Sequence, residues 1–175
     1  MRIAVLTKRF PPECCGVGDY THRLAEELAQ QGHEPIIFVA SAASPRPEGL
    51  RVVELPLRGW RNIPAAARTI RAERPDRIQL EYSNYAWSRY GFAFWLNALV
   101  FRLRWAGLPV TLALHEFPLD FGKGAALAGL ALVQRLHFAL LVLAANEVLT
   151  NTPQRIRILH RLFSWCRSTI RYRPN

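Results

Sequence analysis

The sequence has little cysteine, and its cysteines do not form the pattern of a known site. Only three occur in 175 residues: Cys14 and Cys15 are adjacent, and Cys166 stands alone. An odd count without a framework indicates a reducing compartment. Adjacent cysteines do not readily share one tetrahedral metal ion, and no histidine or further cysteine lies at ligand spacing from them. We therefore expect no metal site and no redox site at this pair.

Acidic residues are also scarce, with 13 Asp and Glu against 23 Lys and Arg, which gives a net charge of +10. Such a balance favours partners that carry phosphate or anionic lipid head groups, although a basic solvated surface gives the same numbers. The chain has no zinc-finger spacing, no basic zipper and no RNP-like aromatic motif. We therefore expect no nucleic acid among its partners.

The sequence shows no signal peptide and no clear membrane span. Met1-Arg2 leads directly into the run IAVLT, which is too short for a signal core and is typical of a buried strand. Residues 124–145 are long and apolar enough to span a bilayer, but Gln134, Arg135 and His137 lie at their centre. This pattern predicts a core helix, or one lying against a membrane. We expect a cytoplasmic protein, with peripheral contact to the inner face of the membrane as an option.

Strand-like and helix-like segments alternate along the whole chain, and no repeat interrupts them. Strands are predicted at 3–7, 35–40, 51–57, 76–82, 108–115, 147–150 and 168–173, and helices at 21–34, 63–75, 88–105, 124–145 and from Pro153 onward. This order predicts one α/β domain over 1–175: a Rossmann-like, doubly wound, mostly parallel sheet with helices on both faces. Such a sheet binds ligands at the carboxyl ends of its strands, near the first strand.

The run PPECCGVGDYTHRL places Gly16 and Gly18 between the first strand and the first helix. Free amides at a helix start bind anions, and glycine lets a ligand approach the backbone closely. A dinucleotide site is disfavoured, because Thr21 stands where the third glycine should be and no acidic residue follows the second strand. A structural role, in which the glycines only let the chain turn into the helix, stays open.

The stretch MRIAVLTKRFPPECCGVGDYTHRLAEELAQQGHEPIIFVA resembles the amino-terminal start of family 4 glycosyltransferases, which have the GT-B fold. The resemblance rests on the Pro pair, the glycine turn and the Gly-His pair at the end of the helix. Cys15 replaces the first glycine of the usual Gly-Gly pair. PDRIQLEYSNYAW, VTLALHEF and VLTNTPQRIRIL resemble later parts of the same domain, so the resemblance covers nearly all of the chain.

The resemblance implies roles for particular residues. Gly16 and Gly18 would contact the donor phosphate or the acceptor, and His115 would be the catalytic residue beside the donor sugar. Glu116 would orient His115 or be solvated. Without the resemblance, the preferred interpretation of His115 is a strand-end histidine bonded to a nearby carbonyl.

Five further residues are predicted to bind the acceptor, or to serve the fold instead. Asp19 is an acceptor-side candidate or the helix N-cap, and Tyr20 follows it. Tyr82, Asn84 and Tyr85 offer hydrogen-bonding and stacking groups for a sugar, or cover the core.

Glu73 and Glu81 have the E-x7-E spacing of retaining glycosyltransferases. In that family the pair belongs to the carboxyl-terminal domain. We therefore interpret this match as chance.

The resemblance also implies a partner, because a GT-B enzyme closes its cleft with a second, carboxyl-terminal domain that binds the nucleotide sugar. We expect the chain to be the amino-terminal, acceptor-side half of a retaining enzyme, inactive alone. The nucleotide sugar would be the donor substrate, without a cofactor or a metal, and the acceptor a sugar or a lipid-linked sugar. Residues 91–107 would lie on an anionic membrane or pack on the sheet. A non-catalytic module that binds saccharide, lipid or protein is the alternative.

Overall fold

The computed structural model describes residues 1–40, 47–55, 57, 59–118, 124–164 and 170–173. Most predicted helices and strands are present, with boundaries shifted by a few residues. The elements are β1 (Arg2–Thr7), α1 (Gly16–Gln30), β2 (Glu34–Val39), β3 (Arg51–Glu54), the 3-10 turn η1 (Trp60–Asn62), α2 (Ile63–Ala72), β4 (Arg77–Tyr82), α3 (Asn84–Trp87), α4 (Phe94–Trp105), β5 (Val110–Leu114), α5 (Ala125–Ala144), β6 (Glu147–Thr150), α6 (Pro153–Leu162) and β7 (Ile170–Tyr172).

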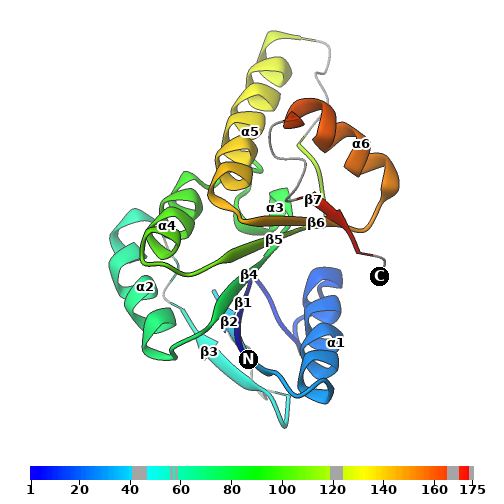
Figure 1. Ribbon diagram of the computed structural model, residues 1–175. Coiled ribbons are helices and arrows are strands. Elements are labelled where there is room, and N and C mark those ends of the chain that lie inside the picture. Colours follow the sequence, from blue (N-terminus) through cyan, green and yellow to red (C-terminus); the bar gives the residue numbers. More distant parts are fainter. Residues whose placement is uncertain (41–46, 56, 58, 119–123, 165–169, 174–175) are drawn as a thin grey trace.

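The strands form one seven-stranded sheet in the order β3-β2-β1-β4-β5-β6-β7, and all neighbouring pairs are parallel (Figure 1). The predicted Rossmann-like α/β class is confirmed. β1 lies between β2 and β4. The chain first adds β2 and β3 on one side of β1, and then adds β4, β5, β6 and β7 in turn on the other side. A crevice opens at the carboxyl ends of the strands at such a switch point.

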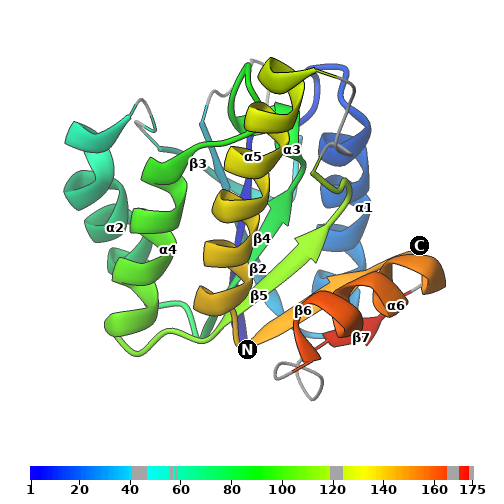
Figure 2. The same ribbon diagram turned by 90° about the horizontal axis from the view of Figure 1, so that it is seen from above.

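Helices cover both faces of the sheet. In β1, Ile3 and Val5 point to the face covered by α1, while Ala4 and Leu6 point to the opposite core. Figure 2 shows α2, α4 and α5 side by side along that opposite face, with α1 on the other side of the sheet. Period-two alternation in a strand buried on both faces produces these two apolar clusters.

The predicted helix 88–105 is wrong in its first third, because α4 begins only at Phe94. Gly91 in this segment has φ +74°, which ordinary L-residues rarely adopt. A side chain there would also collide with Gln134, whose Nε2 donates to the Tyr90 carbonyl at 2.8 Å. The segment before α4 is therefore a tight loop held by α5.

Helix α5 is long and apolar enough to cross a membrane by length and composition, and 33% of its most apolar window is buried inside the protein. Its buried side includes both Gln134 and His137. In the sequence, these two polar residues indicated that the segment does not span a membrane. In the structure, they face the protein interior.

His137 is fully buried in the core between α5 and the sheet. Its ring lies 5.7 Å from the Tyr82 ring and 5.5 Å from the Phe94 ring, centroid to centroid. Neither ring nitrogen has a hydrogen-bond partner among the described residues. Burial disfavours the charged imidazole and lowers the pKa of His137 to about 4.

We expect this histidine to make the fold less stable in acid. The unfolded chain takes up a proton on His137 below its ordinary pKa, whereas the folded chain resists protonation down to about 4. Stability that is present above that ordinary pKa should therefore be lost as pH falls toward 4, by roughly 1–3 kcal/mol. Urea unfolding of the wild type and His137→Phe between about pH 7 and pH 4.5 measures this. Parallel stability curves for the two proteins would contradict it.

Candidate functional site

A cleft of about 540 Å³ opens at the carboxyl ends of β1, β4 and β5. It is lined by Lys8, Arg9, Cys15, Gly16, Val17, Ser83, Tyr85, Ala86, His115 and Glu116. A second cleft of about 390 Å³ lies along α1 and is lined by Gly16, Asp19, Tyr20, Arg23, Leu24, Glu27 and Arg173. Gly16 borders both clefts, so the first turn of α1 stands between them.

The two predicted glycines have different environments. Gly16 begins α1, and a Cβ built there would meet nothing within 4 Å. Gly18 is buried, and a Cβ there would lie 3.0 Å from the Arg9 carbonyl oxygen and 3.4 Å from the Phe10 Cα. Gly16 therefore leaves space open at the cleft, whereas Gly18 lets the helix pack against the chain after β1.

The start of α1 presents backbone amides to the clefts. Cys15 is the N-cap, and no side chain within the described ranges caps it. Asp19 lies in the first turn, where its own amide donates to the Cys15 carbonyl at 2.8 Å. The N-cap alternative for Asp19 is therefore wrong, and its exposed carboxylate faces the second cleft.

His115 lies directly after β5, and both of its backbone polar groups are held. Its amide donates to the Tyr82 carbonyl at 2.9 Å, and its carbonyl accepts from Arg155 Nη1 at 2.8 Å. The side chain is 16% exposed and lines the larger cleft. The backbone thus holds the imidazole at the mouth of the crevice.

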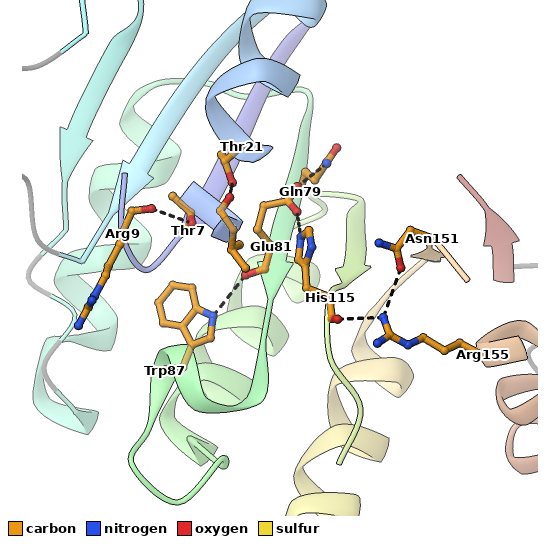
Figure 3. A network of polar contacts seen from close by, with 10 residues as sticks. Thr7, Arg9, Thr21, Gln79, Glu81, Trp87, His115, Asn151 and Arg155 are labelled. Atoms are coloured by element: carbon orange, nitrogen blue, oxygen red, sulfur yellow. Dashed lines mark hydrogen bonds and ion pairs between the residues drawn. The ribbon is translucent and has the colours of Figure 1, made fainter. Parts of the chain in front are cut away.

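The imidazole is paired with a carboxylate that the sequence analysis set aside. His115 Nε2 lies 2.6 Å from Glu81 Oε2, and Gln79 Nε2 donates to Glu81 Oε1 at 2.6 Å (Figure 3). The Glu81 side chain is 0% exposed. A buried carboxylate is stable only when its oxygens are hydrogen-bonded or paired with charge, and here each oxygen has one partner.

Arg155 of α6 connects the other side of His115 to the end of β6. Besides the His115 carbonyl, its Nη1 reaches Asn151 Oδ1 at 3.3 Å, and its guanidinium lies 5.6 Å from the centre of the Phe117 ring. Figure 3 shows His115 between Glu81 and Arg155.

Tyr20 contacts His115 from α1, with an edge-to-face arrangement and 4.9 Å between ring centroids. Burial, and to a smaller degree the Glu81 charge, raises the pKa of the Tyr20 phenol. Tyr20 therefore stays a neutral hydroxyl beside the second cleft.

The three candidates at the end of β4 and in α3 have different environments in the structure. Tyr82 is buried in the core with α2, α4 and α5 and lines neither cleft, which favours its alternative role of covering the core. Asn84 is also buried, and its Nδ2 donates to the Phe117 carbonyl at 2.8 Å. This hydrogen bond connects the start of α3 to the segment after β5. Tyr85 is exposed and lines the larger cleft, where it remains a candidate.

Glu116 does not orient His115, as had been one expectation. Its Oε2 accepts a hydrogen bond from Ser83 Oγ. Glu81 makes the contact with His115 instead, while the Glu116 carboxylate is bonded to Ser83.

Sequence reasoning missed Glu81, Gln79 and Arg155 as parts of this site. One signal was available, since Gln79 and Glu81 are polar residues at alternating positions of an otherwise apolar buried strand. The E-x7-E spacing itself has no structural counterpart. Glu73 pairs with Arg51 at 2.6 Å, and its carbonyl binds Arg2 at the amino end of β1, away from the clefts.

The model of the glycosyl transferase 4-like domain family matches residues 15–175. The chain belongs to this family. The family expected from the sequence is thereby confirmed, and a comparison with curated proteins gives no match.

Solved glycosyltransferases share the fold. One is an alpha-glucosyltransferase in complex with UDP and a 13-mer DNA containing an HMU base, with 13% identity and a TM-score of 0.59 over 98% of this chain and 41% of that chain. The same kind of enzyme with UDP-glucose and DNA containing an abasic site gives 13% identity and 0.58, over 98% and 42%. At such identity the likeness shows the fold alone, and this chain spans less than half of either relative.

The cleft of this glycosyl transferase 4-like domain suits an anionic or polyhydroxylated ligand. Lys8, Arg9, which is paired with Glu13, and the amino end of α1 contribute positive potential, and Glu116 contributes one carboxylate. His115 and Tyr85 offer hydrogen-bonding groups. Among the described residues, no three His, Cys, Asp or Glu side chains come together as a metal site.

We expect the two glycines to differ when substituted. Gly18→Ala should lower the free energy of unfolding by about 1–3 kcal/mol, because the new Cβ meets backbone atoms that cannot move independently. Gly16→Ala, the matched control, should leave it unchanged or raise it slightly, since alanine favours helix. Denaturant titration of the three proteins measures this. Equal stabilities of the two variants would refute the close packing at Gly18.

Proposed function

We propose that this chain is the acceptor-side domain of a retaining, nucleotide-sugar-dependent glycosyltransferase. The observation that carries the proposal is the family match over residues 15–175, together with a histidine held at the carboxyl edge of the sheet. In this proposal the nucleotide sugar is a substrate, and the reaction requires no separate cofactor or metal. The protein acts in the cytoplasm.

Each side of the first turn of α1 has a proposed task. The amides at Gly16 would receive the donor phosphate, because the helix start carries partial positive charge. His115 would hydrogen-bond the donor sugar at the reaction centre. Asp19, Tyr20 and Tyr85 would contact a sugar or lipid-linked acceptor across the two clefts.

A second domain would complete the site. Both clefts lie open at one edge of the sheet, where the described residues supply one wall. Catalysis of group transfer needs a site that excludes water and holds both reactants. We therefore propose that a carboxyl-terminal glycosyltransferase domain binds the nucleotide and closes over these clefts, and that this chain alone is inactive.

A transfer assay tests the proposal. The chain alone, and the chain paired with a carboxyl-terminal domain of the same family, would be incubated with labelled nucleotide sugars and a panel of saccharide, lipid-linked and DNA acceptors. We expect transfer to a saccharide or lipid-linked acceptor by the pair only. His115→Ala should lower the rate roughly 10- to 100-fold, because a contact that positions the reacting sugar is lost.

His22→Ala is the control, because His22 lines neither cleft and its ring packs on Phe10 instead. It should leave transfer within about twofold while the chain stays folded. Transfer to DNA would overturn our expectation about nucleic acid. No transfer by a folded pair, with saturable saccharide or lipid binding by the chain alone, would favour the non-catalytic binding module.

We also propose that the face formed by α5 and α6 lies on an anionic membrane. Leu132, Leu136 and Leu143 project from α5 and Ile158 and Leu162 from α6, each at least 44% exposed. Neither helix contains an acidic residue, whereas Arg135, Arg157 and Arg161 lie on them. Apolar side chains among arginines match the boundary of an anionic bilayer.

Helix α4, the earlier membrane candidate, packs five of its residues into the core but leaves Trp105 84% exposed at its end. Co-sedimentation with vesicles containing phosphatidylglycerol separates the two surfaces. The double variant Leu132→Ser/Leu136→Ser should bind about tenfold more weakly, because it loses apolar area that the bilayer would bury. Trp105→Ser should bind like the wild type.

The electrostatic part of binding should weaken as salt is raised. If Trp105→Ser alone weakened vesicle binding, the membrane contact would be assigned to α4. If the wild type did not bind these vesicles, the membrane proposal would be excluded.

A further inference from the structure

Glu81 is a buried carboxylate on the floor of the crevice, and the role proposed above for His115 does not use it. Its two oxygens are held by Gln79 and by His115, each at 2.6 Å. Burying a carboxylate costs free energy, so a buried carboxylate at the ligand-binding edge of the sheet calls for an explanation. Its short contact with His115 indicates that the carboxylate acts on the imidazole.

The hydrogen-bond inventory decides which atom carries the proton. An ionised carboxylate only accepts, and Gln79 Nε2 already donates to one of its oxygens. The hydrogen of the contact between Glu81 and His115 must therefore come from Nε2 of the ring. Nε2 is then the donor of the 2.6 Å hydrogen bond.

The other ring nitrogen is left for a ligand. Nδ1 of His115 has no hydrogen-bond partner among the described residues and is not buried, and the residue lines the larger cleft. In a neutral imidazole, a proton on Nε2 leaves Nδ1 as an acceptor. A hydroxyl group is the complementary donor.

We propose that Glu81 is a positioning residue, which holds the Nε2–H form of His115 and thereby presents Nδ1 to a hydroxyl group of the bound sugar. This inference rests on the proposed function for its ligand. The contact between Glu81 and His115, however, can be tested on the chain alone.

The ring is held from three sides, which supports a positioning role. Glu81 binds Nε2, and Tyr20 packs against the ring with centroids 4.9 Å apart. The backbone of the histidine is bonded to Tyr82 on one side and Arg155 on the other. Glu81 is fixed in turn, since its carbonyl accepts from Trp87 Nε1 at 3.4 Å.

Nuclear magnetic resonance of the ¹⁵N-histidine-labelled chain tests the hydrogen bond. His115→Gln identifies the resonances of this ring among the five histidines. In the wild type we expect a proton on Nε2 that is shifted downfield and exchanges slowly with water, as a short bond to a carboxylate requires. A wild-type ring without a proton on Nε2 overturns the proposal, whatever the variants do.

Glu81→Gln keeps the shape and removes the charge. We expect the Hε2 resonance to move upfield or to be lost by exchange, while the amide spectrum remains that of a folded chain. Glu116→Gln is the matched control, because that carboxylate is bonded to Ser83 rather than to the ring. It should leave the Hε2 resonance in place. An unchanged resonance in folded Glu81→Gln contradicts the proposal.

Kinetics of the two-domain pair test whether positioning matters for transfer. Glu81→Gln should lower kcat roughly 10- to 100-fold with little change in KM, because a misoriented group weakens transition-state contacts more than binding. An unchanged kcat overturns the positioning role. If no pair shows transfer while the Hε2 resonance behaves as expected, the glycosyltransferase proposal fails and the Glu81–His115 hydrogen bond stands.

Discussion

The parallel register between β4 and β5 determines where the polar groups of the site lie. Glu81 stands beside Ala113 and Tyr82 beside Leu114, so His115 is the first residue beyond the paired strands. Because side chains alternate, Glu81 and His115 point to the same face of the sheet. A shift of one residue would place the carboxylate in the opposite apolar core, without its hydrogen bonds to Gln79 and His115.

The same alternation separates ligand chemistry from core packing. Gln79 and Glu81 face α1, whereas Leu80 and Tyr82 face the core of α2, α4 and α5. Consecutive residues of β4 therefore alternate between polar contacts near the site and packing in the apolar core. The polar face of β4 ends in the cleft, and its apolar face continues into the layer that contains His137.

Helix α1 contributes to the site because it can approach the chain after β1. Gly18 allows this approach, and the approach brings the helix start and Tyr20 next to His115. The switch in winding direction beside β1 leaves the carboxyl edge open at this point. A helix start, an imidazole and two basic side chains thus share one cleft.

The amino-acid sequence by itself determined the alternation of strands and helices, the parallel class of the sheet and the family, because hydrophobic period and glycine placement are local properties. It also indicated His115 and Gly16, which stand at the ends of recognisable elements. Only the tertiary structure decided that Tyr82 and Asn84 are buried, that Gly18 serves packing, and that Glu81 rather than Glu116 holds the imidazole. Those outcomes depend on which strand lies beside which and on the direction of each side chain. Contacts between residues 34 positions apart, such as Glu81 and His115, have no local pattern from which to be inferred.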